Sequence, residues 1–407
     1  MTDNTTPAEP TRPGPRQRTY RQLPRGIWAL GLVSMFMDIS SELVHSLLPV
    51  FMATTLGASM ITIGIIEGIA EAIASFTKVF SGVLSDYVRR RKILVVTGYG
   101  LAALTKLVFP LATSVGWVAA ARMTDRIGKG IRGAPRDALI AALAPPALRG
   151  AAYGLRQALD SAGAFIGPLL AVVFMLLLAD NIQAVLWIAV IPGFLAVFLL
   201  ITGVHEPEYE QTGHGRHRLT LHDARRLQTR YWLVVILGAV FTLARFSEAF
   251  LILRAQDSGM EIAYVPVIMI VMNIVYAVFA YPAGAAADRY PPRWLLLAGS
   301  LVLITADVIL ASATTPAQAL LGAACWGLHM ALTQGLLAKL VADTSPDDLR
   351  GTAFGLFNLI TGAALLLASV IAGALWSQYG ASATFYAGAG FAAIAALGML
   401  GYRSGRQ

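Results

Sequence analysis

Cysteine is nearly absent from this sequence: its 407 residues include one, Cys325, which lies inside an apolar run. A lone cysteine excludes a disulfide framework and a cysteine metal cluster. Charged residues are also scarce, at 13% of the chain, whereas a soluble domain carries roughly 25%. Hydrophobic residues make up 57%. A core of ordinary size cannot bury so many apolar side chains, so much of the surface must face lipid.

Motifs of enzyme chemistry are missing as well. The chain has no Gly-rich phosphate loop, no nucleophile elbow and no His-Glu-x-x-His zinc motif. We therefore expect no enzyme and no cofactor, and an ion gradient must supply the energy for any active transport. The net charge of +8 does not indicate nucleic-acid binding, because Lys and Arg form short clusters between apolar runs with no aromatic pattern beside them. Such clusters are typical of loops that face an anionic lipid surface.

Apolar runs of roughly 20 residues, long enough for a membrane-spanning helix, follow one another along most of the chain. They predict an all-α membrane protein with twelve transmembrane helices in two six-helix bundles, at 27–204 and 231–402. The first run lacks a small-residue cleavage site, so it predicts a membrane span and not a signal peptide. The helices are expected at about 27–52, 61–83, 92–113, 116–143, 151–178, 184–204, 231–254, 262–286, 293–312, 317–343, 351–375 and 381–402.

Polar segments flank and separate the two bundles. Residues 1–26 are rich in Pro and Arg and predict a disordered cytoplasmic tail, and residues 403–407 form a second tail. Residues 205–230 predict a cytoplasmic linker; its histidines could bind a metal, but a solvated linker is the commoner role of such a stretch. Lys and Arg gather in the even-numbered connections and the tails. By the positive-inside rule, both termini are cytoplasmic in a bacterial-type inner membrane.

The two predicted bundles share two sequence motifs. Residues 82–87 resemble residues 284–289, and residues 148–155 resemble residues 349–356 at nearly the same offset. Two independent matches at one spacing indicate a duplicated six-helix unit. In transporters built from such repeats, the substrate site lies between the repeats near mid-membrane.

The first of these motifs resembles a signature of the major facilitator superfamily. Gly82, Leu84, Asp86 and the basic run Arg89 to Lys92 match the family pattern between helices 2 and 3, except that Arg89 stands at a glycine position. The resemblance implies the family's fold of two pseudo-symmetric bundles and a secondary transporter.

Two further segments resemble the same family. Residues 126–134 are similar to its helix 4 signature, with Lys129 in place of a glutamine. Residues 163–171 are similar to the helix 5 signature of antiporting members, through Gly163, Gly167 and Pro168. This second resemblance implies efflux. By itself, the small-residue stripe predicts a helix that packs closely against another.

Asp86 is expected to act as a conformational latch. It lies near the cytoplasmic C-terminus of the second helix, where the helix dipole disfavours an anion. The N-terminus of the eleventh helix, at 351–352, offers free N–H groups on the same side, and Asp288 has the equivalent place in the second bundle. The full latch set is Gly82, Asp86, Arg90, Arg91, Gly284, Asp288 and Arg289.

Ionisable residues inside the predicted spans are costly and usually face an interior cavity. Several of them share helix faces at i, i+4 spacing, and neighbouring carboxylates in a low dielectric can exchange protons near neutral pH. The proton-coupling candidates are Asp38, Glu42, Glu67, Glu71 and Asp160. The substrate-binding candidates are His45, Arg126, Arg156, Gln157, Arg245, Glu248, Asn273, His329 and Gln334.

The same charges allow two other interpretations. They can form buried ion pairs that only hold the first bundle together. Asp38, Glu42 and His45 share one helix face and could bind a divalent metal, although no cysteine lies nearby.

The sequence therefore predicts a proton-coupled secondary transporter that exports a small organic solute and works as a monomer. The alternatives are proton-coupled uptake of a polar or anionic metabolite, transport of a divalent metal or metal chelate, and a non-transporting membrane receptor or sensor. The expected partners are a small-molecule substrate, protons and the lipid bilayer, and no nucleic acid.

Overall fold

The computed structural model describes the chain outside residues 1–22, 89–90, 146–147, 207–226, 347–348 and 402–407. These described residues form helices and no β-strand. Nine of the helices found among them are long and apolar enough to cross a membrane. The expectation of an all-α membrane protein is confirmed.

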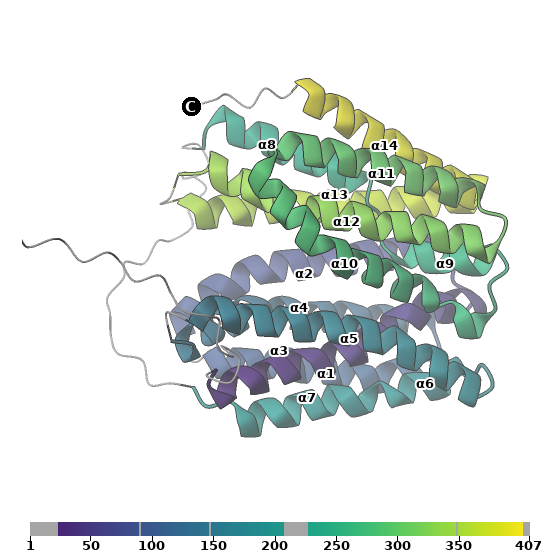
Figure 1. Ribbon diagram of the computed structural model, residues 1–407. Coiled ribbons are helices and arrows are strands. Elements are labelled where there is room, and N and C mark those ends of the chain that lie inside the picture. Colours follow the sequence, from purple (N-terminus) through teal and green to yellow (C-terminus); the bar gives the residue numbers. More distant parts are fainter. Residues whose placement is uncertain (1–22, 89–90, 146–147, 207–226, 347–348, 402–407) are drawn as a thin grey trace, which may run out of the picture.

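Two bundles of helices lie side by side, with the early part of the chain in one and the late part in the other (Figure 1). The first contains α1 (Arg25–Val50), the π-helical turn η2 (Phe51–Thr55), α2 (Met60–Val88), α3 (Arg91–Leu111), α4 (Val115–Leu143), α5 (Arg149–Leu177), α6 (Ile182–Ile188) and α7 (Val190–Gly203). The second contains α8 (Thr229–Leu243), α9 (Ala249–Asp257), the 3-10 turn η5 (Ile262–Tyr264), α10 (Val267–Arg289), α11 (Pro292–Ser312), α12 (Pro316–Thr344), α13 (Arg350–Tyr379) and α14 (Ala381–Gly401).

The fourteen described α-helices form twelve membrane segments, because α6 with α7 and α8 with α9 are each one interrupted segment. The continuous helix expected at 184–204 is therefore wrong in detail. Its break falls at Ala189, whose carbonyl accepts a hydrogen bond of 2.6 Å from Ser40 Oγ. Pro192 follows, and because it has no N–H it cannot bond the Ile188 carbonyl.

The continuous helix expected at 231–254 is also wrong. Residues 244–248 interrupt it between α8 and α9, although they include neither Gly nor Pro. Ser247 supplies the cause: its hydroxyl accepts from the Ala249 N–H at 3.3 Å, while its own N–H donates to Ser369 Oγ at 3.3 Å. A side chain that bonds the backbone locally competes with the helix and begins a new one.

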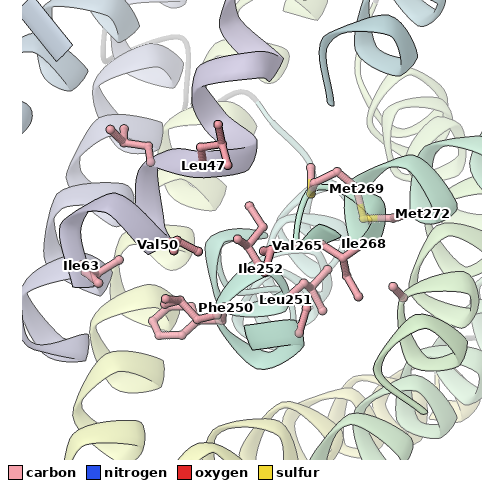
Figure 2. Close-up of a cluster of buried hydrophobic side chains, with 14 of the residues drawn as sticks. Leu47, Val50, Ile63, Phe250, Leu251, Ile252, Val265, Ile268, Met269 and Met272 are labelled. Carbon is pink, nitrogen blue, oxygen red and sulfur yellow. The ribbon is translucent and has the colours of Figure 1, made fainter. Parts of the chain in front are cut away.

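A large apolar cluster joins the two bundles at one end, in addition to the packing of α2 along α13. One buried cluster contains residues of both, among them Val50 and Ile63 from the first and Phe250, Val265 and Met272 from the second (Figure 2). The other three clusters found among the described residues each stay within one bundle. The molecule is therefore closed at the end where α1 finishes, and opening it there exposes large apolar side chains at about 1.5–3 kcal/mol each.

Candidate functional site

A cavity of about 340 Å³ lies between the two bundles. The first bundle lines it with Glu42, His45, Glu71, Ser75, Arg126 and Lys129. The second bundle lines it with Thr242, Arg245, Phe246, Ser247, Glu248, Trp326, Thr361, Gly362 and Leu365. Charged, hydroxyl and aromatic side chains thus share one space, the combination that orients a polar solute with an apolar part.

The wall from the first bundle is built on ion pairs. Arg122 grips Glu67 with two hydrogen bonds, Nη2 to Oε2 at 2.7 Å and Nε to Oε1 at 3.1 Å, and both side chains are buried. His45 lies between two carboxylates, with Nε2 4.0 Å from Glu67 and Nδ1 3.6 Å from Glu42. Glu67 therefore faces its arginine and does not line the cavity, whereas Glu42 does.

A second chain of ion pairs connects α2, α3 and α4. Arg126 lies 3.4 Å from Glu71 and 3.9 Å from Asp125, and Asp125 accepts a 3.0 Å hydrogen bond from Lys106 Nζ. Lys106 is buried on α3. Sequence reasoning missed it as a functional candidate because it stands alone among apolar residues. The isolation itself could have identified it, because a lysine inside an apolar membrane span needs a carboxylate partner.

A third group of charges lies nearer the start of α5, away from the residues that line the cavity. Arg156 pairs with Asp160 on the same helix and lies 3.6 Å from Asp137 on α4. Asp137 also lies 3.4 Å from Arg136. Gln157 follows Arg156 on α5 and is exposed. This group ties α4 to α5, and Arg156, Gln157 and Asp160 do not line the cavity.

Asp38 differs from the other four proton-coupling candidates, because its side chain has no hydrogen bond and no ion pair with any described residue. It lies where α1 meets α5: a Cβ placed on Gly163 would come within 2.9 Å of Asp38 Cβ and 2.6 Å of the Met35 carbonyl. Gly167 is equally tight, at 2.8 Å from the Ile39 carbonyl. Gly163 and Gly167 thus form the α5 surface on which α1 packs, and the adjacent Pro168 is buried.

The wall from the second bundle is the break between α8 and α9. Arg245, Phe246 and Ser247 are non-helical there, and Phe246 packs against Trp326 with ring centroids 5.5 Å apart. An unwound segment in mid-membrane occurs only where it is covered by protein or lines a cavity. In transporters such segments form binding sites. The break therefore faces the charged residues of the first bundle across the cavity.

Three charged groups in the cavity lack an ion pair with any described residue. Within that part of the chain, no oppositely charged atom lies within 4.0 Å of Lys129, Arg245 or Glu248, and their side chains have no hydrogen bond. Arg245 and Glu248 attract each other only at longer range, and Arg245 Nε is buried without a partner. The cavity thus offers free charges of both signs on facing walls.

Two other candidates of the second bundle lie outside the cavity. His329 is buried, its Nδ1 2.8 Å from the Gly299 carbonyl, and its ring lies against Phe241 at 5.2 Å. Asn273 donates to the Ala164 carbonyl at 3.4 Å and so links α10 to α5 across the two bundles.

Six of the seven predicted latch residues lie outside the side chains that the structure describes: Gly82, Asp86, Arg90, Gly284, Asp288 and Arg289. The binding candidate Gln334 lies outside them too. Arg91 is described: its N–H donates to Glu206 at 2.6 Å, and its guanidinium donates to the Ala138 carbonyl at 3.3 Å. It joins the start of α3 to α4 and to the segment after α7.

Within the described part of the chain, no three His, Cys, Asp or Glu side chains come together as a metal site. The interpretation of Asp38, Glu42 and His45 as metal ligands therefore finds no preformed ligand set. His45 is instead held between Glu42 and Glu67.

Comparisons with known proteins agree on the type of molecule. The sequence model of the Major Facilitator Superfamily matches residues 30–275 and 234–406. An uncharacterised MFS-type transporter of Methanocaldococcus jannaschii is 34% identical over 389 residues, which cover 93% of this chain and 95% of that protein. An uncharacterised protein of Mycobacterium tuberculosis is 29% identical over 347 residues, 84% of each chain.

Solved structures share the fold. A structure of the nucleoside transporter NupG superposes with a TM-score of 0.76 at 14% identity, covering 92% of this chain and 99% of that one. The peptide transporter POT also gives 0.76 at 14% identity, with 93% and 94% covered. At this level of identity, the agreement concerns the fold and not the solute.

Proposed function

Because the chain belongs to the major facilitator superfamily, we propose that it is a proton-coupled secondary transporter that exports a small polar organic solute through the cavity between its bundles. The observation that carries this proposal is the set of unpaired charges, Lys129, Arg245 and Glu248, in the described cavity wall. A charge held inside a membrane protein without a partner is costly. Three of them suit a solute that brings the counter-charges itself.

The cavity is proposed to face the cytoplasm. The Lys and Arg distribution favours cytoplasmic termini, and a large apolar cluster joins the bundles at the opposite end. A solute would enter from the cytoplasm. The bundles would then close behind it and part at the cluster containing Val50 and Phe250.

The sign of proton coupling follows from which charge the solute carries. A cationic group that binds a cavity carboxylate competes with a proton for the same oxygens, so solute and proton exclude each other, as antiport requires. Glu248 is the leading position, because its side chain has no ion pair or hydrogen bond with a described residue, while Glu71 and Glu42 already face Arg126 and His45. Export therefore favours an amine or a zwitterion.

An anionic solute would give the opposite coupling. By pairing with Arg126, it would release Glu71, which would then take up a proton; solute and proton would bind together, as in symport. The free cations Lys129 and Arg245 favour this second candidate, proton-coupled uptake of an anionic metabolite. The resemblance of residues 163–171 to antiporters favours the first.

One experiment separates the two candidates. Purified protein in liposomes that contain a pH-sensitive dye would receive amines, zwitterions, carboxylates and neutral sugars in turn, at equal pH on both sides. Antiport predicts that an accepted solute moves protons in the opposite direction to itself, and symport in the same direction. Failure of every class to exchange in counterflow would contradict the transporter proposal itself.

A further inference from the structure

A second buried carboxyl group, outside the site described above, lies in the bundle formed by α8 to α14. Asp307 on α11 is fully buried, and neither of its side-chain oxygens has a hydrogen-bond partner. It also has no ion pair with the residues that the structure describes. Every other buried acidic side chain considered above, except Asp38, faces a cation or histidine or lines the cavity.

Among the described residues, no ionisable side chain pairs with Asp307. Arg254 on α9 donates to the carbonyls of Leu310 and Ala313, at 2.8 and 2.7 Å, and pairs with Asp257. His329 on α12 bonds Gly299, two turns before Asp307 on α11. Arg245 and Glu248 line the cavity, and Gly388 of α14 lies beside the Asp307 carboxyl group.

The ionised form does not fit such a place. An isolated carboxylate moved into a dry interior carries a large solvation penalty, and a group without a partner becomes neutral instead. We propose that Asp307 is a proton-binding site of the second bundle, loaded in this closed-end conformation and separated from the solute cavity by one aromatic side chain.

That aromatic side chain is Phe246. A Cβ placed on Gly388 would lie 2.7 Å from Asp307 Oδ2 and 3.0 Å from Phe246 Cε1, so the carboxyl group and the ring edge border the same small space. Phe246 also lines the cavity. Phe246 also packs on Phe250 and Phe385, with centroids 5.6 and 5.4 Å apart, which seals Asp307 from cavity water.

The break between α8 and α9 supplies the means of release. Phe246 lies in its non-helical segment, which can shift without breaking a helical hydrogen-bond ladder, and Arg245 precedes it directly. When this segment moves, the acid meets cavity water, the proton passes to that water, and the carboxylate left behind gains Arg245 as counter-ion. The proton site stands on the geometry alone, whereas its role in coupling rests on the proposed function.

Infrared spectroscopy tests the proton directly. In the reconstituted full-length protein at neutral pH, the C=O stretch of a protonated carboxylic acid is expected in the wild type, and the Asp307→Asn variant is expected to lack one such band. Asp180→Asn, at an exposed turn, is the matched control and should leave the spectrum unchanged. An identical acid band in the wild type and Asp307→Asn would overturn the proton site.

A second variant keeps Asp307 and so does not depend on the folding of Asp307→Asn. Phe246→Ala removes the side chain between the acid and the cavity, and a carbodiimide, which reacts with protonated carboxyl groups, should then modify Asp307 at least tenfold faster than in the wild type. Equal labelling rates, measured by mass spectrometry, would overturn the proposed seal.

The coupling role has its own readout. Asp307→Asn is expected to retain solute counterflow but to move fewer protons per solute. If the variant keeps the wild-type proton ratio, Asp307 has no coupling role, although the proton site and the transporter proposal stand. If the wild type itself moves no solute, the proposed function fails, and the infrared band still decides the proton site.

Discussion

The pair formed by Glu67 and Arg122 offers the sharpest test of whether the acidic residues of α2 serve stability or coupling. Both side chains are buried, and two hydrogen bonds join them. Removing one partner of a buried pair leaves an uncompensated charge and costs about 3–5 kcal/mol, whereas replacing both by apolar groups of similar volume is often neutral or stabilising.

The structure sets the order of the two single variants. Arg122→Met leaves Glu67 with His45, 4.0 Å away, so its cost should be near the lower end, about 3 kcal/mol. Glu67→Met leaves Arg122 without any described carboxylate partner, so its cost should be near the upper end, about 5 kcal/mol. The double variant should return to within about 1 kcal/mol of the wild type.

The free energy of unfolding can be measured by reversible denaturation with dodecyl sulfate in mixed micelles, in a double-mutant cycle. Arg230→Met is the matched control, since Arg230 is exposed; it should change stability by less than about 0.5 kcal/mol. Additive single effects would refute the account of a buried, mutually dependent pair. A double variant that folds but no longer couples protons would restore Glu67 as a proton carrier.

Three further outcomes are expected. Gly167→Val should destabilise the protein by about 1–3 kcal/mol or more, because a Cβ there meets the Ile39 carbonyl at 2.8 Å. Gly154→Val should be tolerated sterically, because a Cβ at Gly154 has nothing within 4 Å. Equal losses of stability in a thermal-unfolding assay would contradict the packing role of Gly167. Glu71→Gln should abolish gradient-driven accumulation but keep counterflow, and normal proton stoichiometry in this variant would mean that its pairing with Arg126 is only structural. In a cysteine-free background, a cysteine at position 55 should react with an impermeant reagent from outside and one at position 213 should not; external labelling at 213 would reverse the proposed orientation.

Hydrophobic runs were sufficient to predict most of the fold. Length and apolarity alone fix which segments can cross a bilayer, and the helices begin and end close to the expected positions. The two errors fall where a tertiary contact competes with the helix. Ser40 donates a hydrogen bond to the Ala189 carbonyl, and Ser369 accepts one from the Ser247 N–H. The sequence of the interrupted segments does not predict these distant partners.

The charges show the same division. Their position in the spans, read from the sequence, identified Glu42, Glu71, Arg126, Arg245 and Glu248 as site candidates, and they line one cavity. Helical periodicity gives the face on which a side chain lies but not the residue opposite it on another helix. The sequence therefore could not separate Glu67, which pairs with Arg122 outside the cavity lining, from Glu71, which pairs with Arg126 and lines the cavity.

The sequence by itself determined that this chain is a membrane protein, contains a repeated helical unit and carries many charges inside its spans. These features depend only on composition and on the spacing of residues along the chain. Only the tertiary structure decided which of those charges are paired, since pairing depends on distances between helices far apart in the chain. The break at 244–248 and the isolation of Asp307 behind Phe246 belong to this second kind. Both features depend on contacts with residues 244–248. Ser369 of α13 accepts a hydrogen bond from the Ser247 N–H, and Asp307 of α11 and Gly388 of α14 lie beside Phe246.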